Sequence, residues 1–238
     1  MNFIRYTLFV FKVLTNILFP HYCLVCKKIG KSICYACYKK LEKTPLSCPY
    51  CLKKTKDGAF HDTCVRPGGI DGLISLFYYN RSLMKFLFGI KYRLAKGALQ
   101  ELFVRDDYIK QRVAVLKKHN IGAIVPIPLS RIRENKRGFN QSNIIAGLVS
   151  HQIKKPVWQV LIRKKNTQPL AKTKSKLERA EIIHNAFEVD ERYMKDTVGK
   201  TLLLVDDVYT SGATTREAAK TLKACGVRRV FVFVVAQG

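Results

Sequence analysis

Residues Thr201 to Thr215, TLLLVDDVYTSGATT, indicate the fold more clearly than any other segment of the chain. The apolar run from Leu202 to Val205 predicts a buried strand. Two carboxylates follow this run, then a loop of small residues, and then the helical pattern of residues 214–224. In open parallel sheets, ligands bind at the carboxyl ends of the strands. The segment therefore predicts an α/β fold with a binding site at this edge of the sheet.

The loop has the residue types that surround a phosphate group. Backbone N–H groups at the start of a helix bind anions, glycine permits close approach, and hydroxyl groups add donors. We therefore predict a phosphate site at Thr210, Ser211, Gly212, Ala213 and Thr214.

The carboxylates of Asp206 and Asp207 precede the loop, where they can accept hydrogen bonds from sugar hydroxyls. The alternative is a helix N-cap preceded by a solvated acidic turn. The chain has neither G-x-x-x-x-G-K-S/T nor G-x-G-x-x-G after a strand, which excludes an ordinary ATPase or dehydrogenase.

Strand and helix patterns alternate along the second part of the chain, which favours a parallel sheet flanked by helices. A near-continuous β-branched run, typical of a strand buried on both faces, completes the pattern near the C-terminus. Strands are predicted at 73–79, 123–126, 201–205 and 229–235, and helices at 82–93, 107–118, 141–153 and 214–224.

Seven of the eight cysteines lie between Cys23 and Cys64, mostly in pairs separated by two residues. One tight turn can aim both members of such a pair at the same tetrahedral metal, so four pairs predict two closed zinc sites. In chain order the first site is all cysteine, and the second has three cysteines and one histidine. Interleaved pairing fits the same spacings. The zinc ions would be structural, because protein ligands fill every position. The ligands are Cys23, Cys26, Cys34 and Cys37, then Cys48, Cys51, His61 and Cys64.

These patterns predict three parts: an amphipathic helix over 1–20, a zinc-ribbon module over 21–66 and an α/β domain over 70–238. The amphipathic helix is expected to pack against the rest of the chain. The alternative is that it anchors weakly on a membrane surface with Arg5 and Lys12 at the headgroups. Thiolate ligands and the lack of a convincing signal peptide predict a cytoplasmic protein.

Two motifs resemble known families. Residues 205–214, VDDVYTSGAT, resemble the phosphoribosyl pyrophosphate (PRPP) motif of type I phosphoribosyltransferases. The resemblance implies that Asp206 and Asp207 hold the ribose hydroxyls, that the following loop holds the 5′-phosphate, and that Mg²⁺ accompanies PRPP. Together with the cysteine-rich N-terminus, residues 137–142, RGFNQS, resemble the ComF/ComFC family of competence proteins over nearly the whole chain. That family implies uptake of single-stranded DNA in natural transformation beside a ComFA helicase.

Basic residues suggest a second contact surface. The chain has 43 Lys and Arg against 17 Asp and Glu, a net charge of +26, which favours an acidic partner such as single-stranded DNA. After Pro126-Ile127-Pro128, placed like a pyrophosphate loop, four basic residues suit pyrophosphate or a nucleic-acid backbone. These residues are Arg131, Arg133, Lys136 and Arg137. Residues 163–176 form a further basic segment, which is expected to close over the sugar or to follow DNA phosphates.

The leading hypothesis is a ComF-like competence factor that handles incoming single-stranded DNA and has a PRPP-type pocket. One alternative is an active phosphoribosyltransferase in nucleotide salvage. Against it, Thr210 stands where oxopurine-specific relatives have an acid near the base, so general-base help from that position is missing. Another alternative is that the zinc module is an adaptor for a helicase or other protein.

Overall fold

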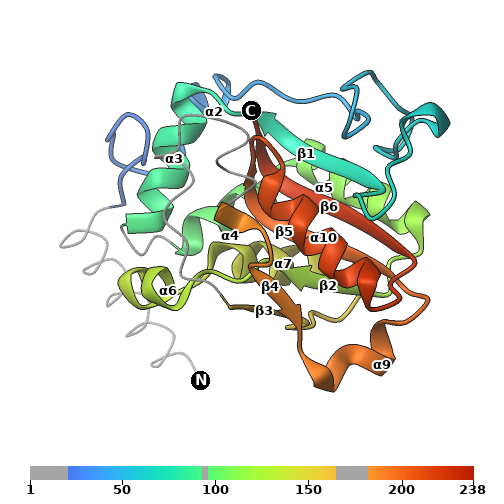
Figure 1. The fold of residues 1–238 in the computed structure, drawn as a ribbon. Coiled ribbons are helices and arrows are strands. Elements are labelled where there is room, and N and C mark those ends of the chain that lie inside the picture. The colour runs from blue at the N-terminus through green and yellow to red at the C-terminus, as the bar shows by residue number, and fades with distance from the viewer. Residues whose placement is uncertain (1–20, 93–95, 165–181) are drawn as a thin grey trace, which may run out of the picture.

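The computed structural model describes residues 21–92, 96–164 and 182–238 (Figure 1). The expected helix over 1–20, with its docking or membrane-surface role, and residues 165–176 of the basic segment lie outside the described residues. No described helix is both long and apolar enough to cross a bilayer.

A four-stranded parallel sheet forms the centre of the protein, in the order β1-β6-β5-β2. The predicted α/β fold, a parallel sheet flanked by helices, is confirmed. The strands are β1 (Gly72–Tyr78), β2 (Ala123–Pro126), β5 (Thr201–Tyr209) and β6 (Arg229–Gln237). A separate antiparallel pair consists of β3 (Leu161–Arg163) and β4 (Phe187–Val189).

Alternate residues of β5 and β6 enter two different cores, because successive side chains of a strand point to opposite faces. Leu203 and Phe233 belong to the core under α3, α4, α5 and α7, whereas Leu204 and Val232 belong to the core under α10 and the β3-β4 pair. The sheet is thus buried on both faces, which explains the unbroken apolar runs.

The helices are α2 (Tyr35–Tyr38), α3 (Arg81–Tyr92), α4 (Lys96–Arg105), α5 (Asp107–Val115), α6 (Arg131–Arg137), α7 (Gln141–Ile153), α9 (Met194–Thr197) and α10 (Ala213–Ala224), with short 3₁₀ turns η1 (Asp62–Cys64), η2 (Leu116–His119) and η4 (Glu191–Tyr193).

The cysteine-rich segment packs directly on this α/β unit. Cys23 and Leu24 are buried in the same core as the α3 residues, and a Cβ on Gly89 would lie only 3.0 Å from the Leu24 side chain. Residues 43–59 make single antiparallel bridges with β1. The guanidinium of Arg112 on α5 donates to the carbonyl oxygens of Thr44 (2.9 Å) and Ser75 (3.0 Å). The module and the domain therefore share one core instead of packing as separate bodies.

Candidate functional site

Strand β5 delivers the acid pair to the carboxyl edge of the sheet, and α10 begins immediately beyond it. Gly212 is the N-cap of α10 and has a φ of 70°. A Cβ at this position would lie 2.4 Å from the Tyr209 hydroxyl and 2.6 Å from Nη1 of Arg216. Only glycine fits the turn, both because of its positive φ and because the space is filled.

The predicted phosphate residues do lie around one hollow. Its lining consists of Asp206 and residues 208–215. Thr210 is exposed, whereas Ser211 and Thr214 are half-buried. Arg216, which we did not predict, donates from its guanidinium to the Ser211 carbonyl oxygen (2.5 Å). The hollow thus lies at the N-terminal end of α10 and is lined by hydroxyl side chains, two features that suit an anion.

Asp206 is held by neighbours from two elements. Its Oδ1 accepts a hydrogen bond from the Ser142 hydroxyl of α7 (3.0 Å) and another from the backbone N–H of Asp207 (2.9 Å). Burial, followed by the adjacent charge of Asp207, raises the pKa of Asp206 to about 7. Near neutral pH this carboxyl is therefore divided between its protonated and ionised forms.

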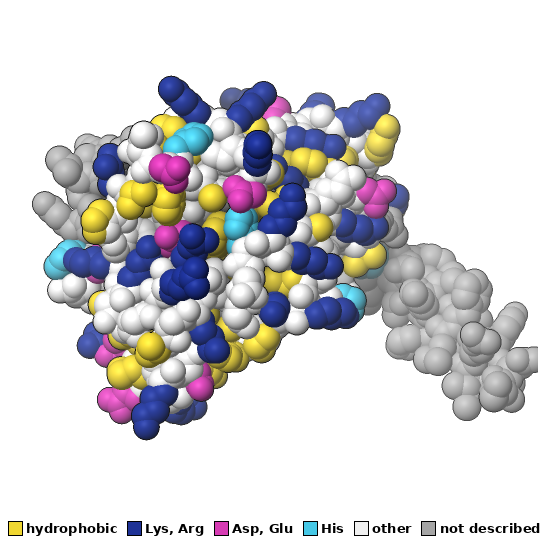
Figure 2. Space-filling model, turned by 90° about the vertical axis from the view of Figure 1, so that its right-hand side faces the viewer, with side chains coloured by type: hydrophobic (Ala, Val, Ile, Leu, Met, Phe, Trp, Pro, Cys, Tyr) yellow, Lys and Arg dark blue, Asp and Glu magenta, His cyan; other side chains and the backbone are white. Residues whose placement is uncertain are grey.

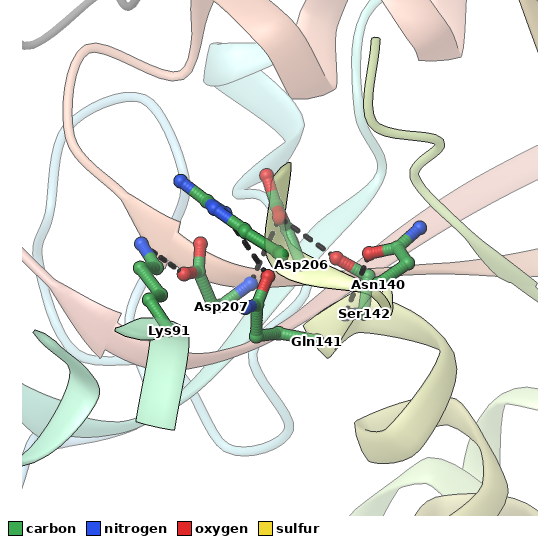
Figure 3. A network of polar contacts seen from close by, with 7 residues as sticks. Lys91, Asn140, Gln141, Ser142, Asp206 and Asp207 are labelled. Atoms are coloured by element: carbon green, nitrogen blue, oxygen red, sulfur yellow. Dashed lines mark hydrogen bonds and ion pairs between the residues drawn. The ribbon is translucent and has the colours of Figure 1, made fainter. Parts of the chain in front are cut away.

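Asp207 points to the other side of the strand, where it forms an ion pair with Lys91 near the end of α3 (Figure 3). Both side chains are largely buried. No sequence pattern predicts this pair, because Lys91 belongs to a helix whose position depends on tertiary packing.

The start of α7 completes the network. Asn140 caps the helix by accepting from the Ser142 N–H (3.0 Å), and its side-chain amide donates to the Ile127 carbonyl oxygen after β2 (2.9 Å). Oε1 of Gln141 accepts from the Arg137 guanidinium (3.1 Å). Apart from Arg137, residues 137–142 were predicted only as part of a family motif, and they join the loop after β2 to the acid pair of β5.

The four predicted basic residues lie on helix α6, and the structure separates them into two kinds. Arg131 and Lys136 are exposed, whereas Arg133 and Arg137 are half-buried. Arg163 of β3 also lies near the site and was predicted only as part of a basic segment. Burial, followed by the charge of Arg133, lowers the pKa of Arg163 to about 10, while Asp206 opposes this shift. Arg163 is thus close enough to interact electrostatically with both Asp206 and Arg133.

The predicted metal ligands form two groups in chain order, not interleaved. Within each group, the ligand atoms lie within 4.8 Å of one another. Both groups begin with the same turn: Lys27 N–H donates to the Cys23 carbonyl and Leu52 N–H to the Cys48 carbonyl, with Lys27 and Leu52 at positive φ. The first group is Cys23, Cys26, Cys34 and Cys37, and the second is Cys48, Cys51, His61 and Cys64.

The donor set of each group fits a thiophilic tetrahedral ion. Burial alone would raise the thiol pKa values of Cys23 and Cys48, but hydrogen bonds from nearby groups, mainly backbone N–H, outweigh it and lower both to about 6. His61 is oriented by its Nε2, 3.4 Å from the Lys54 carbonyl oxygen, which can only accept. Its Nδ1 is thereby left as the ligand atom, 3.3 Å from the sulfur of Cys51.

Positive charge is spread widely over the surface. Figure 2 shows Lys and Arg side chains distributed over one whole face, with few acidic side chains among them. This distribution matches a net charge of +26 and is not confined to the edge that holds the acid pair.

Curated relatives resemble the chain over most of its length. Competence protein ComFC of Bacillus subtilis (strain 168) is 30% identical over 203 residues, covering 82% of this chain and 79% of the relative. Competence protein F of Haemophilus influenzae is 27% identical, covering 90% and 96%. DNA utilization protein YhgH of Salmonella typhimurium (strain LT2) is 26% identical, covering 89% and 88%.

No family model matches the chain. Among solved structures, glutamine PRPP amidotransferase from B. subtilis, complexed with ADP and GMP, is 18% identical with a TM-score of 0.32, covering 47% of this chain and 22% of that chain. A structure described as the allosteric regulatory enzyme of purine biosynthesis is 19% identical, with a TM-score of 0.30 and coverage of 47% and 21%. The fold assignment rests on the strand order and helix placement of this chain.

Proposed function

The chain belongs to the ComF family of competence proteins, and on that premise we propose that it handles incoming single-stranded DNA in natural transformation and binds a phosphoribosyl ligand such as PRPP at the edge of its sheet. The observation on which the second part rests is the hollow lined by Asp206 and residues 208–215. An anion in the loop and a sugar hydroxyl on the carboxylate would occupy it together.

In this proposal, Thr210 to Thr214 hold the 5′-phosphate through the N–H groups of α10 and the loop hydroxyls. Asp206 and Asp207 accept hydrogen bonds from the ribose hydroxyls, and Mg²⁺ arrives with PRPP. Asp207 must exchange its contact with Lys91 for the ligand, so ligand binding is linked to the end of α3. The half-buried Arg133 and Arg137 are the candidates for the pyrophosphate.

Two glycine variants test the pocket. Gly212→Ala places a methyl group against Tyr209 and Arg216, whereas Gly226→Ala adds one at a similar positive φ, with its nearest neighbour, Val198, at 3.4 Å. Both should lose on the order of 1 kcal/mol of stability from backbone strain. Only Gly212→Ala should lose PRPP binding, measured by calorimetric titration with Mg²⁺. If PRPP does not bind the wild-type protein, or if Gly212→Ala binds it normally, the pocket proposal is wrong.

The DNA part of the proposal is supported by family membership and by the excess of positive charge. Phosphate neutralisation by Lys and Arg supplies affinity without sequence preference. A helicase of the ComFA kind would be its partner in uptake, in the cytoplasm. Co-purification of the two proteins tests this, with loss of the complex in Ile29→Asp/Tyr35→Asp, at two exposed positions of the cysteine-rich module, assigning the contact to that module.

The two ligand groups are proposed to hold structural Zn²⁺. Because protein atoms provide all four ligands of each group, the ion would stabilise the turn and leave no position for a substrate. Elemental analysis of protein purified without chelator should give two zinc ions per chain.

A second candidate function is phosphoribosyl transfer in nucleotide salvage. It is favoured by the acid pair and the phosphate loop, which together retain the groups needed to hold PRPP. Pyrophosphate release from PRPP and Mg²⁺ in the presence of nucleobases tests it, with Asp206→Asn/Asp207→Asn as the control. Binding without release would leave the site as a ligand sensor for the DNA-handling role.

A further inference from the structure

The side chain of Gln141 has a buried donor that the protein itself does not use. The residue is only 3% exposed, and its Nε2 has no hydrogen-bond partner among the described residues. Buried polar groups are nearly always paired, and leaving one unpaired destabilises the fold. Such a donor beside a candidate binding site points to a partner that arrives with the ligand.

The orientation of this amide is determined by its neighbour. Oε1 accepts from the Arg137 guanidinium (3.1 Å), and a guanidinium has no acceptor. Turning the amide over would place its NH₂ group against N–H donors, so the NH₂ group must lie on the other side. Figure 3 shows the Gln141 amide close to Asp207, with Lys91 on the other side of that carboxylate.

The Gln141 amide is a fixed donor and the neighbouring Asp207 carboxylate is a fixed acceptor. Together they match a hydroxyl group better than other ligand groups. A hydroxyl oxygen can accept from Gln141 while its hydrogen is donated to Asp207. A phosphate oxygen would be repelled by the carboxylate, and an ammonium could not accept from the amide. The pair Gln141 and Asp207 is therefore built for a sugar hydroxyl.

The two acids face different parts of a bound sugar. Asp206 lines the phosphate hollow, whereas Asp207 does not and instead faces Lys91. In a 5-phosphorylated ribose, the 3-hydroxyl is nearer to the phosphate and the 2-hydroxyl is farther from it. With the phosphate in the loop, Asp206 is placed for the 3-hydroxyl and Asp207 for the 2-hydroxyl.

We infer that Gln141 determines specificity for ribosyl over 2-deoxyribosyl ligands by donating to the 2-hydroxyl, an assignment that rests on the proposed phosphoribosyl site. A site that hydrogen-bonds a hydroxyl rejects the analogue without it, because the buried groups are then unpaired. A protein that works beside DNA would thereby keep its pocket from filling with deoxyribosyl phosphates.

The test compares ribose 5-phosphate with 2-deoxyribose 5-phosphate by calorimetric titration of the full chain. We expect the wild-type protein to prefer ribose 5-phosphate by at least about tenfold. Gln141→Glu keeps the size of the side chain and its acceptor for Arg137 but removes the donor. Gln141→Met removes the donor without adding charge. Both variants should weaken binding of ribose 5-phosphate and leave binding of 2-deoxyribose 5-phosphate nearly unchanged. The preference, which is the ratio of the two affinities, should therefore fall close to one.

Four results would count against the inference. A wild-type preference near one, or an unchanged preference in both variants of normal thermal stability, would show that Gln141 does not read the hydroxyl. If neither sugar phosphate nor PRPP binds the wild-type protein, the phosphoribosyl site itself is wrong. Equal loss of both sugars in Gln141→Met and Gln141→Glu would assign the residue to general support of the site.

Discussion

Lys91 and Asp207 form an ion pair that joins the end of α3 to the end of β5 (Figure 3). These residues are 116 positions apart, and the pair places an ammonium beside two adjacent carboxylates. The Lys91 charge also lowers the pKa of Asp206, although burial and Asp207 raise it by more. The free protein therefore balances its acid pair with its own cation.

Replacing this cation should make the acid pair less stable in its ionised form. Lys91→Met leaves Asp207 largely buried without its ammonium, which should lower the free energy of unfolding by about 1–2 kcal/mol at pH 8. It should also raise the pKa of Asp206 further above its ordinary value. Urea unfolding at several pH values measures the first effect, and carboxyl NMR titration measures the second. Lys85→Met, at an exposed position of the same helix, is the matched control. An unchanged Asp206 titration would contradict the proposed coupling.

The raised pKa of Asp206 predicts how stability depends on pH. The folded protein holds this proton up to about pH 7, whereas an unfolded chain releases it near 3.8. Between these values the folded state binds more protons, so this residue makes stability fall as pH rises from about 4 to 7 and contributes no further change above that.

Asp206→Asn should remove this slope, since an amide does not titrate. Relative to the wild type, the variant should gain on the order of 4 kcal/mol between pH 4 and pH 8, because a pKa shift of about three units corresponds to about 1.4 kcal/mol per unit. Chemical unfolding across that range measures the difference. Asp196→Asn, at an exposed position of α9, should run parallel to the wild type. Parallel curves for Asp206→Asn and the wild type would show that Asp206 titrates normally.

The parts of the site that follow from local sequence could be predicted, and those that depend on distant packing could not. The strand, acid pair and loop of 201–215 are consecutive, so their place at the sheet edge follows from the pattern alone. The pairs of metal ligands were similarly local. By contrast, Lys91 and Gln141 reach the site only because α3 and α7 pack into the same core, which periodicity does not reveal.

Some elements were also too short for a periodic signal. Strands β3 and β4 have three residues each, and α6 has seven with little apolar pattern, so residues 131–137 were interpreted as a basic tail. The predicted boundary between the module over 21–66 and the domain over 70–238 falls at a Pro-Gly-Gly sequence, residues 67–69. Nevertheless, Cys23 and Leu24 of the module lie in the main core of the domain. A break in composition showed where the chain turns, but not where its side chains pack.

The shared core predicts that the two metal groups contribute differently to stability. Cys37 is 5% exposed and belongs to the main core, whereas Cys64 is half-buried beside η1. Cys37→Ser should lower the Tm by ~10 °C. This corresponds to a loss of roughly 3 kcal/mol, since each kcal/mol shifts the Tm of a chain this size by roughly 2–4 °C. Cys64→Ser should lower it by much less. Calorimetry measures both, and elemental analysis should find one zinc ion per chain in each variant. Equal shifts would show that the two groups support the fold to the same extent.

The exposed cations of α6 predict where single-stranded DNA is bound. Arg131 and Lys136 lie just beyond the carboxyl end of β2, whereas Lys117 and Lys118 of η2 lie before its other end. All four are exposed, so the double variants Arg131→Ala/Lys136→Ala and Lys117→Ala/Lys118→Ala remove the same charge from opposite edges of the sheet.

If α6 contacts the DNA, the first variant loses two phosphate contacts. The slope of log affinity against log salt should then become shallower by about 1.4, since each contact to a single strand contributes about 0.7. At 0.15 M salt this corresponds to roughly a tenfold loss of affinity. Fluorescence anisotropy of a labelled oligothymidine, measured at several salt concentrations, gives both values. The η2 variant should keep the wild-type slope. Equal changes in the two variants would mean that DNA follows the general positive charge of the surface, and that α6 has no special place in the contact.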